Sequence, residues 1–141
     1  MNHRRPENPE IAKRVWQGYE GVKAGARWIA VEEHFSENCA ELFIDDEPEF
    51  WQLVMGSLSE IKQAGPPRCY AGWRPPEKAG EAGIKGLELW PFRWTSEVWR
   101  EKLELEAPEL VWNKLMYLKF VIRNDGDRHS YGHVDIHKNR P

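Results

Sequence analysis

The histidines near the C-terminus are the first residues whose type and spacing suggest chemistry. Tyr131, His133, Asp135 and His137 occur at every second position, which on a β-strand places their side chains on one face. An imidazole gains or loses a proton near neutral pH, and a neighbouring carboxylate orients the ring and favours its charged form. We therefore take Tyr131, His133 and His137 as candidate catalytic residues. The alternative is a solvent-facing strand, for which polar alternation is ordinary.

A metal site on His133, Asp135 and His137 is a third interpretation, because imidazoles and carboxylates both bind zinc and manganese. Residues two apart on a strand are separated by ~6.5–7 Å, so they reach one ion only if the strand bends. The sequence therefore predicts no metal, and it contains no feature that predicts another cofactor.

Basic residues surround the histidines. Lys119 and Arg123 are four positions apart, so a strand presents both on one face, where they would stabilise a phosphate and complete the candidate catalytic set. Further candidate binding residues are Arg128, Lys138 and Arg140. The alternative is an edge strand that its charges protect from aggregation.

Glycines and prolines crowd residues 65–86, which predicts a loop of about 20 residues. Trp73 and Arg74 lie inside this loop. An indole beside a guanidinium can stack on a base or on a partner side chain, so we include both as candidate binding residues. The alternative is that Trp73 pins the loop to the domain.

Several function classes are excluded by what the sequence lacks. It has no P-loop, no dinucleotide-binding glycine pattern after a strand, and no Gly-x-Ser-x-Gly motif. Its two cysteines form no CxxC pair, which is typical of a reducing compartment. No apolar run is long enough to span a membrane, and no secretion signal opens the chain. We therefore expect a cytoplasmic protein without membrane contact.

The elements that must position these residues can be read from periodicity. Apolar residues at helical spacing predict helices over 11–26, 28–42 and 48–64, the last with a start signal at Asp45–Pro48. Residues 87–90 predict a strand at a sheet edge, and 96–103 predict a short helix.

Residues 115–123 and 131–137, joined by the turn 124–127, predict a C-terminal β-hairpin. The 141 residues fit one domain of the α+β class, with N-terminal helices packed on a small, mainly antiparallel sheet. Within it, residues 1–10 form a polar arm, 11–64 an acidic helical part, 65–86 the loop and 87–141 the sheet part.

Charge is distributed unevenly along the chain. Residues 1–64 carry 7 Lys and Arg against 12 Asp and Glu, whereas residues 115–141 carry 5 against 3. The acidic helical half and the mildly basic C-terminal end make a polarised molecule, which permits an anionic ligand at the C-terminal end. A pI near 6.0 argues against nonspecific binding along a long nucleic acid.

The order of elements resembles the RelE/HigB-like toxin superfamily over about residues 49–141. A helix that ends in SLSEIKQAGPP (57–67) leads to GLELWPFR (86–93), then to YLKFVI (117–122), and the last strand ends in VDIHKNRP (134–141). The resemblance implies a small α+β domain that cleaves mRNA, commonly on the ribosome, and that an antitoxin holds inactive. Positions that match the family in residue type are Lys119, Arg123, Tyr131, His133, His137 and Lys138. The chain departs from the family in its net charge of -3, its acidic helical extension and an insertion at 95–114.

Two functions follow as hypotheses. The first is a RelE-like endoribonuclease toxin that cleaves RNA by metal-independent general acid–base chemistry. The second is a non-catalytic interaction protein, of the immunity or anti-defence type, that binds a basic partner through its acidic helices. The sequence leaves the oligomeric state open.

Overall fold

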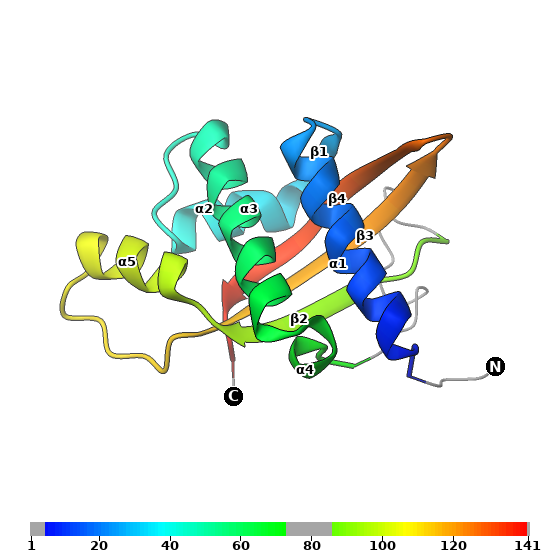
Figure 1. The fold of residues 1–141 in the computed structure, drawn as a ribbon. Helices are drawn as coiled ribbons and strands as arrows, with labels where there is room; N and C mark the ends of the chain where they lie inside the picture. Colours follow the sequence, from blue (N-terminus) through cyan, green and yellow to red (C-terminus); the bar gives the residue numbers. More distant parts are fainter. Residues whose placement is uncertain (1–4, 73–85, 141) are drawn as a thin grey trace.

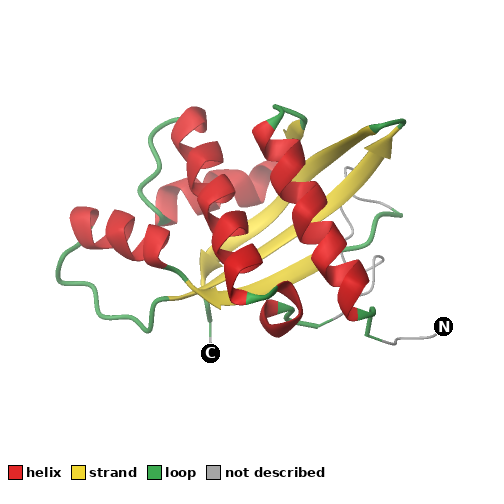
Figure 2. Cartoon of the chain, in the orientation of Figure 1, coloured by secondary structure: helices red, strands yellow, loops and turns green. Residues whose placement is uncertain are grey.

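The computed structural model describes residues 5–72 and 86–140, and Figures 1 and 2 show these as helices around one sheet. The elements in chain order are α1 (Asn8–Lys23), β1 (Arg27–Ile29), α2 (Glu32–Glu41), α3 (Glu47–Ala64), α4 (Pro66–Cys69), β2 (Trp90–Thr95), α5 (Glu97–Glu106), β3 (Leu115–Asp125) and β4 (Arg128–Lys138).

The sheet has the strand order β1-β4-β3-β2. β3 and β4 form the predicted C-terminal hairpin, β2 pairs antiparallel with β3, and β1 adds a short parallel pairing to β4. The predicted α+β fold with N-terminal helices and a mainly antiparallel sheet is therefore confirmed. Pro91 lies on β2, an edge strand, where its missing N–H costs no central hydrogen bond.

Helices α1 and α3 cross one face of the sheet, as Figure 1 shows. Beneath them lies a core of fully buried side chains that includes Ile11 and Val15 from α1, Phe50 and Leu58 from α3, and Phe120 from β3. In each of these helices, apolar residues at a spacing of about 3.6 residues form one face, and this face is buried against the sheet. We call the opposite face of the sheet, turned away from α1 and α3, the outer face.

Local signals set the ends of two helices where the sequence predicts them. The Asp46 carboxylate accepts a hydrogen bond from the Glu49 amide at 2.8 Å and caps α3. α3 ends at Gly65, whose φ of 102° favours glycine. Ser96 caps α5 in the same way, accepting from the Trp99 amide at 3.1 Å.

The predicted helix over 28–42 is wrong in its first turn. Residues 27–29 form β1 instead, because β4 offers them backbone partners: the Tyr131 amide donates to the Ala26 carbonyl at 2.9 Å, and the Ala30 amide donates to the His133 carbonyl at 2.8 Å. Other boundaries differ as well. α1 begins at Asn8, inside the predicted polar arm, and ends at Lys23 rather than 26. β2 begins at Trp90 rather than 87, and the start of the predicted loop folds as α4.

Candidate functional site

A β-bulge in β4 breaks the alternation on which the predicted catalytic face depends. Phe120 pairs with His133, whereas the preceding residue, Lys119, pairs with Asp135, so Val134 is an extra residue on β4. A bulge of this kind changes which face the residues after it present. The residues on either side of Val134 therefore do not share the single face that the sequence pattern predicts.

His133 and Tyr131 point under the helices, so their predicted place on a polar face turned away from the core is wrong. Both are 0% exposed. The His133 ring meets Phe50 edge-on with centroids 4.8 Å apart, and the Tyr131 ring meets Trp51 at 5.9 Å. The predicted alternation is correct in placing Tyr131 and His133 on the same face of β4. That face, however, is the one that packs against the core.

Burial also removes the acid–base chemistry of His133 near neutral pH. It lowers the His133 pKa to about 3, because a charged ring is poorly solvated in the core; Asp135 opposes this shift and His34 adds to it. His133 Nε2 donates a hydrogen bond to the Asn38 side-chain oxygen at 3.0 Å. The Tyr131 pKa is raised well above its usual value by the same desolvation.

A different set of polar side chains meets on the outer face. The residues of β3 that alternate with the positions under α1 and α3 are Tyr117, Lys119, Val121 and Arg123, of which Val121 is 0% exposed in a second apolar cluster with Val134. Tyr117 pairs with Arg93 of β2 on one side and with His137 of β4 on the other. Arg93, Tyr117 and His137 thus form a row across three strands, and Lys119 and Asp135 form the next row.

His137 lies beside Asp135 and is 7% exposed, so little of its ring reaches the surface. His137 Nδ1 donates to the backbone carbonyl of Lys138 at 2.8 Å, and His137 Nε2 lies 3.5 Å from the Asp135 carboxylate. The His137 ring stacks on Tyr117 with centroids 5.1 Å apart and planes at 19°. Because Nδ1 is held by the carbonyl, Nε2 is the atom through which this ring can exchange a proton.

Asn38 of α2 holds the bulge and the Asp135 side chain together. Its Nδ2 donates to Asp135 at 2.9 Å, and its side-chain oxygen accepts from the Ile136 amide at 3.0 Å as well as from His133. Asn38 is 2% exposed. Beyond the end of β1, α2 therefore supplies the hydrogen-bond partner for the backbone of β4. The Asn38 side-chain amide also orients the Asp135 carboxylate, which faces His137.

The candidate cations do not all reach this site. Lys119 lies opposite Asp135, and no ion pair to Lys119 occurs within residues 5–72 and 86–140. Arg123 is on the same face, but four residues along the strand, or about 13 Å. Its guanidinium lies over the Trp28 ring at 4.3 Å. Gly132 allows Trp28 to lie flat there, because a Cβ at 132 would meet the indole at 2.5 Å.

The predicted binding residues are dispersed. Lys138 pairs with Met116, a core residue, and so lies on the helix-covered side. Arg140 is 3.8 Å from Glu41, and Arg128 is at the hairpin turn. Trp73 and Arg74 lie outside the described residues.

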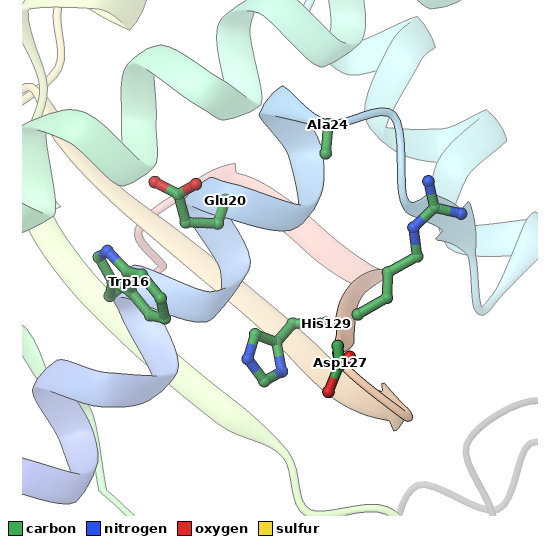
Figure 3. Close-up of a pocket in the computed structure, with 6 residues that line it drawn as sticks. Trp16, Glu20, Ala24, Asp127 and His129 are labelled. Carbon is green, nitrogen blue, oxygen red and sulfur yellow. The ribbon is translucent and has the colours of Figure 1, made fainter.

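Arg128 and His129 line a separate groove of about 460 Å³ between α1 and the hairpin turn, shown in Figure 3. Trp16 and Glu20 form its α1 side. Trp16 is 47% exposed, and its ring lies 6.1 Å from His129. None of the outer-face residues Arg93, Tyr117 and His137 lines this groove.

The three side chains of the His-x-Asp-x-His pattern do not converge, since His133 is in the core and His137 on the outer face. Among the residues that the structure describes, no group of three or more His, Cys, Asp or Glu is arranged to hold a metal ion.

Within the same ranges, no helix combines the length and apolarity that crossing a bilayer requires.

Sequence reasoning missed Arg93 and Asn38. Arg93 becomes part of the site only through strand pairing, which brings β2 beside β3. Asn38 sits beside the apolar stripe of its helix and carries no motif; its three hydrogen bonds are to residues 95 to 98 positions away. The Tyr117–His137 contact could have been predicted. The sequence indicates that β3 pairs with β4, and alternation along β3 places Tyr117 on the same face as Lys119.

No protein-family model matches this chain, and no curated protein or solved structure matches it significantly.

Proposed function

We propose that this protein cleaves single-stranded RNA at the outer face of its sheet, as an endoribonuclease of the RelE-like toxin type. The observation that carries the proposal is the row of Arg93, Tyr117 and His137, with Lys119 and Asp135 beside it. It combines a proton-transfer pair with two cations on one face, which phosphodiester chemistry requires.

In the proposed reaction, His137 Nε2 takes the proton of a ribose 2′-OH, and the 2′ oxygen bonds to phosphorus. The Asp135 carboxylate, 3.5 Å away, stabilises the imidazolium that forms. Lys119 and Arg93 neutralise the charge of the phosphorane. The 5′ oxygen leaves with a proton from the Tyr117 phenol, so the products are a 2′,3′-cyclic phosphate and a 5′-OH end.

The distribution of charge supports an anionic substrate on this face. Among the paired strand residues of this face, Arg93, Lys119 and Arg123 are cations and Asp135 is a carboxylate. The carboxylates of the N-terminal half lie on α1, α2, α3 and their connections instead. An RNA strand on the outer face would meet these cations, and α2 borders the site where Asn38 contacts Asp135.

A cleavage assay tests the proposal. Wild-type protein is incubated with a labelled single-stranded RNA and, in parallel, with a DNA of the same sequence, which lacks the 2′-OH. We expect cleavage of the RNA alone and cyclic phosphate ends. His137→Ala should reduce the rate by about 10²- to 10⁴-fold, as loss of a general base does. Lys119→Ala should weaken RNA binding.

The matched control is His129→Ala, which removes a partly exposed histidine at the other end of β4 and should leave the rate unchanged. Induced expression in a bacterial host gives the cellular readout: wild type should arrest growth and translation, and His137→Ala should not. Wild-type protein that neither cleaves RNA nor arrests growth would contradict the proposal and favour a non-catalytic interaction protein. A wild-type rate in His137→Ala would refute the assigned base.

A further inference from the structure

The chain carries no Lys or Arg between Arg27 and Lys62, a stretch that includes α2 and most of α3. It contains nine carboxylates, of which three bind groups outside the stretch, while Asp46 caps α3 and Glu47 accepts a hydrogen bond from the Trp51 indole. Glu41 lies 3.8 Å from Arg140, Glu49 lies 3.1 Å from Lys102, and Glu60 accepts hydrogen bonds at the start of α5. The other six are exposed and have no ion pair in the described parts of the chain: Glu32, Glu33, Glu37, Asp45, Asp46 and Glu47.

A groove of about 350 Å³ opens within this surface, between α2 and the start of α3. Its apolar lining comes from Phe35 and Cys39 of α2 and from Ile44 of the connection. The remaining lining residues are Ser36, Asp45, Asp46 and Glu47. We call this the α2–α3 groove: it has an apolar floor and an acidic rim, and none of its lining residues is a cation.

Two neighbouring residues indicate that the groove is suited to an apolar and cationic occupant. Phe43, in the same connection, leaves 43% of its surface exposed although it is a large apolar side chain. The pKa of the Cys39 thiol is raised by burial and, in addition, by the charges of Glu47 and Glu49, in agreement with the carboxylates that line the groove. These carboxylates attract ammonium and guanidinium groups.

The fold does not use the outer side of α2. Of its ten residues only Asn38 is buried, and it faces β4. Glu41 at its end contacts Arg140, but no cation pairs with Glu32, Glu33 or Glu37 in the described parts of the chain, so these three carboxylates repel one another. A partner that brings positive charge would relieve this repulsion while it buries the apolar floor.

We infer that the α2–α3 groove docks a basic, amphipathic segment of a partner protein, with an apolar side chain on Phe35, Cys39 and Ile44 and with Lys or Arg side chains against Asp45, Asp46 and Glu47. This mode matches the recognition of amphipathic helices by apolar grooves. The inference is independent of the proposed RNA cleavage, because no lining residue belongs to the outer-face site.

The probe is a fluorescein-labelled peptide of about 18 residues, made of Leu, Lys and Ala with leucines at i, i+3, i+4 and i+7. Binding to the full chain is measured by fluorescence anisotropy. Asp45→Asn/Glu47→Gln removes two rim charges, keeps the Asp46 cap, and should weaken binding about tenfold. Ser36→Trp fills the groove from an exposed position, without a change of charge, and should weaken it by a similar factor.

The charge-matched control is Glu101→Gln/Glu109→Gln, which removes two exposed carboxylates on and after α5 and should leave the affinity unchanged. A peptide of the same composition without the apolar stripe should bind more weakly than the probe. Equal weakening by the control pair, or equal binding of the two peptides, would reduce the effect to unspecific charge attraction and overturn the inference. Absence of binding to wild type would do the same.

A second copy of the chain is the competing occupant. Sedimentation equilibrium of wild type and Ser36→Trp decides this point, because a dimer seated in the groove would dissociate in the variant. We expect both proteins to have the same mass. If wild type is a dimer and Ser36→Trp dissociates it, the occupant of the groove is a second copy of the chain and the inference of a basic partner is overturned.

Discussion

At the scale of single residues, His133 is an imidazole that the core holds neutral. Its Nε2 donates to Asn38, and its ring packs against Phe50. Its pKa of about 3 lies below the 6.5 of a solvated histidine, because burial penalises the charged form. The unfolded chain therefore binds a proton between pH 6.5 and 3 that the folded chain does not, and the stability contributed by neutral His133 is lost as the pH falls through this window.

This difference predicts a pH-dependent loss of stability. Between pH 6 and 4, the free energy of unfolding of wild type should fall by about 1.4 kcal/mol per pH unit more than that of His133→Gln. Glutamine keeps a donor for Asn38 but does not titrate. Urea unfolding at pH 7, 6, 5 and 4 measures both curves. Parallel curves for the two proteins would show that His133 is solvated or charged in the folded state.

At the scale of elements, α3 connects the core to α5. Glu60 on α3 accepts hydrogen bonds from the Trp94 indole at 3.1 Å, the Ser96 hydroxyl at 2.7 Å and the Glu97 amide at 2.8 Å. One carboxylate thus joins α3, the end of β2 and the N-terminus of α5, where the helix dipole favours negative charge.

We expect Glu60→Ala to destabilise the protein by about 2–4 kcal/mol, because it leaves the buried Trp94 and Ser96 side chains without their acceptor. The control is Gln63→Ala, an exposed position on the same helix, with an expected change of about 0.5 kcal/mol or less. Chemical denaturation gives both values. Equal effects in the two variants would mean that water replaces the carboxylate without cost.

Leu58 tests the packing of α3 on the sheet. It is 0% exposed, in the core beneath the helices. Leu58→Ala should lower the free energy of unfolding by about 2–5 kcal/mol, because it removes buried methyl groups and leaves a cavity. Leu105→Ala on α5, where the side chain is 82% exposed, is the matched control. A loss below about 1 kcal/mol at Leu58 would contradict this packing.

At the scale of the whole molecule, the chain separates its charges. The outer face of the sheet presents Arg93, Lys119 and Arg123, whereas α2 and the start of α3 present carboxylates. The proposed RNA substrate and the proposed basic partner therefore attach to different surfaces, and each is attracted by local charge rather than by the net charge of -3.

Salt should weaken RNA binding in proportion to the phosphates that these three cations neutralise. For a single strand we expect a slope of about −2 for log Kobs against log salt concentration in wild type. In Lys119→Ala the slope should be shallower by about 0.7. Anisotropy titrations of a labelled RNA from low to moderate salt measure both slopes. A slope near zero in wild type would show that phosphate contacts do not drive binding.

The sequence determined the elements whose signals are local. The cap at Asp46, the stop at Gly65 and the cap at Ser96 each involve residues within three or four positions, so α3 and α5 could be predicted from spacing alone. The β3–β4 hairpin follows from two runs of β-formers and the turn between them. The α+β class follows from these elements together.

Only the tertiary structure decided the composition of the site. Alternation correctly put Tyr131 and His133 on one side of β4, but which side is buried depends on where α1 and α3 pack. The bulge at Val134 then turned Asp135 and His137 to the outer face, beside Arg93 and Tyr117 from other strands. Residues 27–29 have apolar spacing that favours a helix, yet they form β1. They do so because their hydrogen bonds are to β4, about 100 residues later in the chain. Long-range pairing of this kind leaves no signal in local spacing, which is why the histidine pattern could be found in the sequence and its surroundings could not.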